Sequence, residues 1–170
     1  FASSIFVPYI KSLNLPNLLM VAPDTGGTKR ANAYGKHLGV DIAICYKQRK
    51  VANQIEKMTV IGDVKGRDVV LVDDMCDTAG TLTKAADMMM EQGASSVRAI
   101  CTHPVLSGEA CQRIERSALT SLIVTDTIPI SAQKMAQTTK IEQLPVAPLF
   151  GGVIQRMRAH ESISSHFIIA

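Results

Sequence analysis

Residues 69–81 have the sequence VVLVDDMCDTAGT, in which four apolar residues lead into two adjacent aspartates and then into a run of small residues. The apolar residues predict a strand that is buried on both faces, as in a parallel sheet covered by helices. The small residues predict a tight loop, and the residues from Thr81 to Gln92 predict a helix that ends at Gly93. The stretch is therefore expected to form a strand, a loop and a helix in that order.

Short apolar segments alternate with helical patterns along the rest of the chain. The apolar segments predict strands at 18–22, 41–46, 58–64, 97–101 and 122–124, and the helical patterns predict helices at 28–38, 108–116 and 147–159. This alternation is typical of an α/β fold with a mostly parallel central sheet flanked by helices. In such sheets ligands bind in the loops that follow the carboxyl ends of the strands, so these loops are the candidate site.

The loop of residues 77–81 has the features of an anion site. It can turn its backbone N–H groups inward, and the helix that follows adds its positive dipole end, while Thr78 and Thr81 offer hydroxyl donors. Asp73 and Asp74 suit the vicinal hydroxyls of a sugar or a hydrated magnesium ion rather than the phosphate itself. A phosphate site beside a diol site fits a ribose phosphate. The alternative is a strand end with solvated acids and a capped helix.

A second loop, residues 22–27, precedes the helix predicted at 28–38. Gly26 and Gly27 allow the backbone to approach a ligand closely, and the start of the helix again offers N–H groups to an anion. Lys29 and Arg30 lie in the first turn, where positive charge is unfavourable for the helix dipole. Their position indicates a nearby anion or acid, although a surface pair of basic residues is the simpler interpretation.

The polar segment 47–56 is weakly patterned and is predicted to form a loop. Lys47 and Arg49 lie two residues apart in it, and a mobile loop that carries cations can stabilise charge on a reacting phosphoryl group. Taken alone, a charged run of this kind is more often a solvated surface.

Composition excludes several classes of protein. The chain has 170 residues and a net charge of +3, with no tryptophan and no broad basic stripe, which argues against a nucleic-acid partner. No apolar run reaches the length of a membrane span, and the first residues do not form a signal peptide, so we expect a cytoplasmic protein with no membrane partner. The four cysteines have no metal-site spacing and are expected to be reduced, structural thiols. They are Cys45, Cys76, Cys101 and Cys111.

Residues 69–81 resemble the phosphoribosyl diphosphate binding motif of type I phosphoribosyltransferase folds. With alanine at position 79, the motif is more similar to that of ribose-phosphate diphosphokinases, also called phosphoribosyl diphosphate synthetases, than to that of base-using transferases. Five further segments resemble the same family in the same order: 23–27, 60–67, 101–108, 124–129 and 146–150. The resemblance covers nearly the whole chain and implies the type I phosphoribosyltransferase fold.

The resemblance also implies roles for individual residues. Ribose 5-phosphate would be bound by Asp73, Asp74, Asp77, Thr78, Ala79, Gly80 and Thr81. The diphosphate loop would be Asp24, Thr25, Gly26, Gly27 and Thr28, with Asp24 as a ligand of the Mg²⁺ cofactor. The catalytic cations would be Lys47 and Arg49, although this sequence departs from the common pattern at Tyr46 and Gln48. A phosphate or ADP effector site between subunits would include the tail residues Ser162, Ser164 and Ser165.

The implied reaction transfers the diphosphoryl group of ATP to ribose 5-phosphate, giving phosphoribosyl diphosphate and AMP. Residues 1–170 would then be the C-terminal domain of a hexameric enzyme whose homologous N-terminal half is not in this chain. We expect the chain to carry the ribose 5-phosphate half of the site and to form little product alone. Two alternatives remain: a base-using phosphoribosyltransferase, and a non-catalytic subunit associated with a synthetase.

Overall fold

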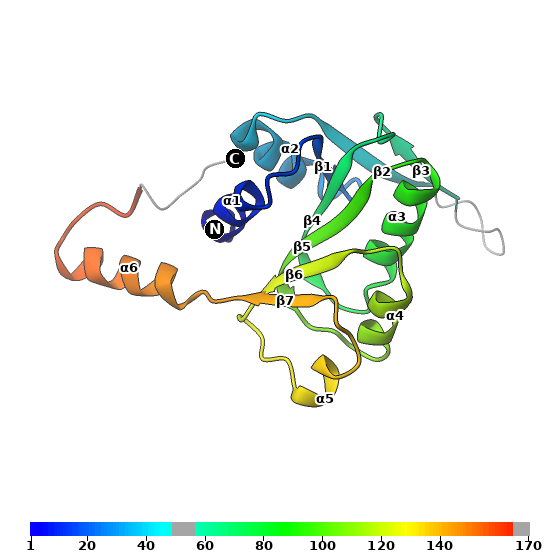
Figure 1. The fold of residues 1–170 in the computed structure, drawn as a ribbon. Coiled ribbons are helices and arrows are strands. Elements are labelled where there is room, and N and C mark those ends of the chain that lie inside the picture. Colours follow the sequence, from blue (N-terminus) through cyan, green and yellow to red (C-terminus); the bar gives the residue numbers. More distant parts are fainter. Residues whose placement is uncertain (49–56, 165–170) are drawn as a thin grey trace.

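A computed structural model of the chain describes residues 1–48 and 57–164. These residues form a seven-stranded sheet in the order β3-β2-β1-β4-β5-β6-β7, with helices on both sides (Figure 1). The strands are β1 (Leu18–Ala22), β2 (Ile42–Gln48), β3 (Lys57–Ile61), β4 (Asp68–Cys76), β5 (Ser96–Pro104), β6 (Ser121–Thr125) and β7 (Ile141–Leu144). The helices are α1 (Ser3–Ser12), α2 (Thr28–Leu38), α3 (Gly80–Glu91), α4 (Ala110–Arg116), α5 (Ala132–Met135) and α6 (Ala147–Arg158).

The strand pairing confirms the predicted α/β fold with a mostly parallel sheet. All neighbouring strands are parallel except β2 and β3, which pair antiparallel at one edge. This edge corrects the loop prediction at residues 47 and 48, whereas the rest of the predicted loop, 49–56, lies outside the described residues. Strand β2 continues through Lys47 and Gln48, which pair with Met58 and Lys57, because polar residues are tolerated where an edge hairpin extends beyond the core.

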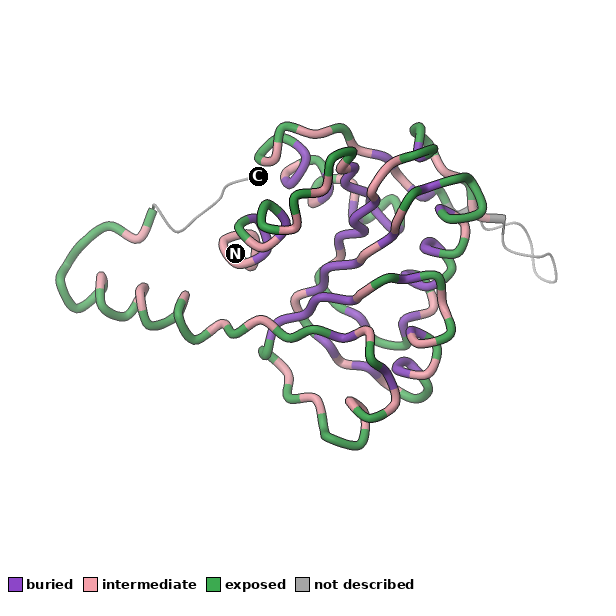
Figure 2. Tube along the Cα trace, viewed as in Figure 1, coloured by how far each residue is buried: buried purple, intermediate pink, exposed green. Residues whose placement is uncertain are grey.

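Alternate residues of the central strands supply two separate apolar layers. Met20, Val70 and Val72 face one layer together with α1 and α2, whereas Val21 and Leu71 face the other together with α3 and α4. Figure 2 shows the resulting buried band through the middle of the sheet. Since successive strand residues point to opposite faces, a continuous apolar run such as 69–72 is what a sheet covered on both sides requires.

Three elements were absent from the sequence prediction: α1, α5 and β7. Helix α1 contains Pro8 and begins without a side-chain cap, so it lacks the usual sequence signals of a helix. Its tertiary contacts stabilise it, because Phe6 and Ile10 are buried and the hydroxyl of Tyr9 donates a 2.5 Å hydrogen bond to Glu142 of β7. No helix in the described ranges is long and apolar enough to cross a membrane.

Helix α6 was predicted and is present, but none of its residues is buried. In Figure 1 it extends away from the sheet beyond β7. The cysteines behave as predicted: all four are buried and free of disulfide bonds, and burial raises the pKa of the Cys45 and Cys76 thiols to about 12.

Phe6→Ala is expected to destabilise the chain by about 3–5 kcal/mol, because it leaves a cavity between α1 and the sheet. The matched control is Phe150→Ala on α6, whose side chain is 58% exposed against 1% for Phe6. The control should change the free energy of unfolding by less than about 0.5 kcal/mol. Urea denaturation of both variants measures the difference, and equal effects would contradict the packing of α1.

Candidate functional site

Three loops meet at one edge of the sheet because the strands before them are neighbours and run parallel. Strand β4 pairs with β1 on one side and with β5 on the other. The loops that follow β1, β4 and β5 therefore leave the sheet at the same edge. The structure brings together the segments 23–28 and 73–81, which are two of the candidate segments from the sequence.

The segment from Asp77 to Thr81 forms a cradle at the start of α3. Together with Asp73 it lines a cavity of about 150 Å³. Ala79 has a left-handed backbone with φ of 62°, and this turn leads directly into the helix. Among the described residues, the backbone N–H groups of Gly80, Thr81 and Leu82 have no hydrogen-bond partner. Free amides at a helix start, combined with the helix dipole, favour an anion at this position.

The loop that follows β5 forms backbone hydrogen bonds with the cradle. The amides of Leu106 and Ser107 donate hydrogen bonds of 3.0 Å to the carbonyls of Cys76 and Asp77. From α4, the guanidinium of Arg113 donates to the carbonyl of Thr78. The role of Arg113 cannot be predicted from the sequence, because this contact joins residues 35 positions apart and no local pattern signals it. These bonds fix the backbone of the cradle before any ligand arrives.

The loop after β1 is organised by Asp24. Its Oδ1 accepts a 3.0 Å hydrogen bond from the amide of Gly27, and the hydroxyl of Thr28 donates a 2.8 Å bond to the carbonyl of Thr25. A Cβ added at Gly26 would lie 3.2 Å from Asp24 Oδ1, so a larger side chain there would disturb this arrangement. The amides at the start of α2 therefore lie in a loop whose shape depends on the absence of a side chain at residue 26.

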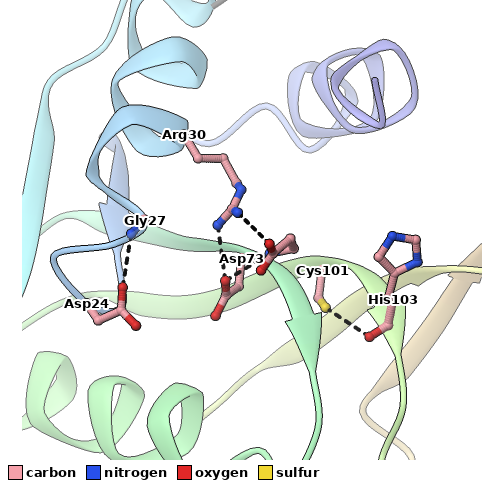
Figure 3. Close-up of polar contacts among 7 residues, drawn as sticks. Asp24, Gly27, Arg30, Asp73, Cys101 and His103 are labelled. Carbon is pink, nitrogen blue, oxygen red and sulfur yellow. Dashed lines mark hydrogen bonds and ion pairs between the residues drawn. The ribbon is translucent and has the colours of Figure 1, made fainter.

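Arg30 links the start of α2 to the two acids of β4 (Figure 3). From the first turn of α2, its Nη1 lies 3.1 Å from Asp73 Oδ1 and its Nη2 lies 2.9 Å from Asp74 Oδ2. The amide of Asp74 also donates a 2.9 Å hydrogen bond to Asp73 Oδ1. The expectation of an anion or acid near Lys29 and Arg30 is therefore confirmed for Arg30, and its partners are the two acids of β4.

Other candidate residues are not assembled with these loops in the described part of the chain. Lys47 has a described backbone position on β2, while its side chain and Arg49 lie outside the described residues. Ser162 and Ser164 follow α6 and share a 2.8 Å hydrogen bond between their hydroxyls, and Ser165 lies outside the described range. His103 of β5, in contrast, lies beside the segment 73–81, because it pairs with Met75 of β4, and its ring shares a 2.9 Å hydrogen bond with the hydroxyl of Thr127.

The comparisons with known proteins agree with the motifs. The family model for the phosphoribosyl synthetase-associated domain matches residues 50–168. The chain is 50% identical over 166 residues to the ribose-phosphate pyrophosphokinase of Porphyromonas gingivalis, covering 97% of the chain and 52% of that protein. It is 47% identical to the enzyme of the same name from Wolinella succinogenes, covering 99% of the chain and 53% of that protein.

The chain belongs to the phosphoribosyl synthetase-associated domain family. A solved structure, the phosphoribosylpyrophosphate synthetase from Mycobacterium smegmatis, superimposes with a TM-score of 0.83 at 33% identity, covering 94% of this chain and 51% of that one. The chain thus spans about half the length of the relatives it matches, and it is homologous to their C-terminal half. The predicted phosphoribosyltransferase-type fold is confirmed.

In this synthetase-associated domain, the pKa values of Asp73 and Asp74 are shifted in opposite directions from the ordinary value of an aspartate. Burial at the end of the central strand raises the pKa of Asp73 to about 6; the neighbouring carboxylate of Asp74 adds to this rise, and Arg30 only partly offsets it. The more exposed Asp74 is also affected by desolvation, but its hydrogen bond with Asp73 and the charge of Arg30 hold its pKa below the usual value. The pair therefore keeps its readily ionised carboxylate at the exposed position.

Asp73→Asn is expected to stabilise the domain above pH 6 and to leave its stability unchanged below about pH 4. Since the folded-state pKa of about 6 lies above the ordinary 3.8, the wild type loses stability as the pH rises through this interval. The amide removes that loss, which should raise the free energy of unfolding at pH 8 by about 1 kcal/mol, or Tm by about 3 °C. Thermal unfolding from pH 4 to 8 measures the gain.

Asp74→Asn is the matched control for this experiment. Because the pKa of Asp74 is lowered, its charge contributes stability above pH 4, and the variant should be less stable than the wild type at pH 8. Destabilisation of similar size by both substitutions would contradict the assignment of the buried, costly charge to Asp73.

Proposed function

We propose that this chain carries the ribose 5-phosphate half of a ribose-phosphate diphosphokinase site. The observation that carries the proposal is the cradle at 77–81, with the free amides of Gly80, Thr81 and Leu82 at the start of α3 and two carboxylates of β4 beside it. The cradle would hold the 5-phosphate, and Asp73 and Asp74 would accept hydrogen bonds from the ribose hydroxyls. The relatives named ribose-phosphate pyrophosphokinase support the choice of substrate.

The loop at residues 24–28 is the proposed position of the diphosphoryl group. Asp24 is exposed, and only its Oδ1 is engaged by a described donor, Gly27. No cluster of three or more metal-ligating side chains occurs within residues 1–48 and 57–164. A single carboxylate still fits Mg²⁺, which commonly takes one or two protein carboxylates together with substrate phosphates. Bound at Asp24, the ion would neutralise charge on the phosphate oxygens.

The proposed reaction is an in-line phosphoryl transfer. The anomeric hydroxyl of ribose 5-phosphate attacks the β-phosphorus of ATP, the bond from that phosphorus to the oxygen of AMP breaks, and the hydroxyl proton is released. The protein contributes position and charge rather than covalent chemistry. Lys47 and Arg49 remain the proposed cations for the developing charge. Loss of one such group typically slows the reaction about 10²–10³-fold.

The whole reaction is proposed for a full-length enzyme rather than for this chain. The matched relatives are about twice as long as this chain. We propose that much of the ATP site lies in the part of the full-length enzyme that this chain does not match. The hexamer and the effector role of the serine-containing tail remain predictions for that enzyme. The chain alone should bind ribose 5-phosphate and form little or no AMP from Mg-ATP.

Calorimetric titration with ribose 5-phosphate tests the proposed half-site. The wild-type chain should bind, and Thr81→Val should weaken binding about tenfold, because it removes one hydroxyl donor to a charged phosphate without changing side-chain shape. Thr120→Val, an exposed threonine outside the site, is the matched control and should bind as the wild type does. Absence of binding by the wild type would overturn the proposed function.

Gly26→Val is expected to abolish the binding of inorganic diphosphate in the presence of Mg²⁺ while leaving ribose 5-phosphate binding and Tm nearly unchanged. The new side chain would push Asp24 away from the amide of Gly27, whereas the backbone at residue 26 requires no left-handed conformation. Titrations with each ligand measure the two affinities separately. Undiminished diphosphate binding would place that ligand elsewhere.

A further inference from the structure

The proposed function assigns no role to Arg30, although this residue contacts both acids of the proposed sugar site. Its guanidinium bridges two adjacent carboxylates, with one nitrogen 3.1 Å from Asp73 Oδ1 and the other 2.9 Å from Asp74 Oδ2. Asp73 Oδ1 is occupied a second time by the amide of Asp74. The guanidinium thus engages one oxygen of each acid, and no donor among residues 1–48 and 57–164 forms a hydrogen bond with Asp73 Oδ2 or Asp74 Oδ1.

We propose that Arg30 is a positioning residue that makes the site selective for sugars with two adjacent hydroxyls. By fixing one oxygen of each carboxylate, it presents the remaining two as a matched pair of acceptors for a vicinal diol. This inference rests on the proposed ribose 5-phosphate site and adds the origin of its sugar selectivity. Arg30 acts through the acids and has no assigned contact with the reacting atoms.

The electrostatics of the acids explain why such a residue is needed. Two carboxylates on consecutive residues repel each other, and the side chain of Asp73 is only 21% exposed, so water screens the repulsion incompletely. A planar guanidinium can donate to both acids from fixed directions, whereas a lysine ammonium is a point charge without that fork. Any positive charge at this position would reduce the repulsion between the two acids. The two fixed donor directions of the guanidinium also determine which carboxylate oxygens remain available to a ligand.

The location of Arg30 supports a role in the site rather than in the apolar core. The residue belongs to the first turn of α2, which follows β1, and its partners lie on β4, the neighbouring strand. Its side chain is 32% exposed, at the edge where the two proposed ligand loops meet. Figure 3 shows the guanidinium between the loop containing Asp24 and the end of β4.

The test compares ribose 5-phosphate with 2-deoxyribose 5-phosphate by calorimetry on the wild-type chain and its variants. The wild type should prefer ribose 5-phosphate by about 10–100-fold, since the deoxy sugar leaves a charged acceptor without its hydroxyl. Arg30→Gln should weaken ribose 5-phosphate binding by a similar factor and change 2-deoxyribose 5-phosphate binding by less than about twofold. The ratio of affinities should then approach one.

Two further variants separate geometry from charge and folding. Arg30→Lys keeps the charge but not the fork and should lose most of the selectivity; it also carries the test if Arg30→Gln fails to fold. Arg116→Gln removes an equal charge from an exposed position on α4 and should retain the wild-type ratio. A general loss of stability would weaken the binding of both sugar phosphates and would leave the ratio of their affinities unchanged.

The outcomes distinguish this inference from the proposed function. If the wild type binds and discriminates but Arg30→Gln discriminates equally well, only the role of Arg30 is overturned. Tighter binding of ribose 5-phosphate by Arg30→Gln would also overturn it, because the guanidinium would then compete with the sugar. If the wild type binds neither sugar phosphate, the proposed site fails and the inference fails with it.

Discussion

The parallel pairing of β4 with both β1 and β5 is the constraint on which the site depends. Parallel neighbours end at the same edge of a sheet, so loops that are distant in the sequence are delivered to one place. Residues 24–28 and 73–81 become neighbours through this pairing, and the β5 connection supplies the amides that hold the cradle. No side-chain contact between the loops is required to bring them together, and Arg30 then refines an arrangement that the backbone has already set.

In the cradle, the left-handed backbone position is occupied by Ala79 and not by the adjacent Gly80. Ala79 occupies the left-handed region, which an alanine adopts at a cost of about 1–2 kcal/mol, whereas Gly80 does not use its conformational freedom there. The strain is compensated by contacts around the loop, including the burial of Ala79 and the bonds from Leu106, Ser107 and Arg113. The backbone amides at the start of α3 are thereby held in place before a ligand binds.

The sequence predicted the fold and the cradle well because both are encoded locally. The run at 69–72 signals a doubly covered strand, and the small residues that follow the acids specify a helix start. The strand itself extends beyond the apolar run, through both acids to Cys76, because pairing with β5 continues there. Helix α1 could not be predicted from such signals, since it has no capping side chain and its stability comes from burying Phe6 and Ile10 against the sheet. Short strand β7 is likewise fixed by pairing with β6 rather than by its own composition.

Long-range side-chain contacts explain the remainder of what sequence reasoning missed. The unfavourable charge of Lys29 and Arg30 on the helix dipole indicated a nearby acid, but the choice of Arg30 and of its two partners depends on the β1–β4 register. The contact of Arg113 with the cradle had no local signal. The roles of Lys47 and Arg49 remain predictions from family resemblance, because the first has only a backbone position and the second lies outside the described residues.

The position of Asp73 places stability and binding in conflict. A central strand end is where a sugar-binding carboxylate can be held rigidly, yet the same burial raises its pKa to about 6 and disfavours its charge. Arg30 offsets part of this penalty by pairing with both acids, so the energy of each carboxylate depends on the other and on the guanidinium. Substitutions at these three residues should therefore be non-additive, because each one changes the charge state that the other two experience.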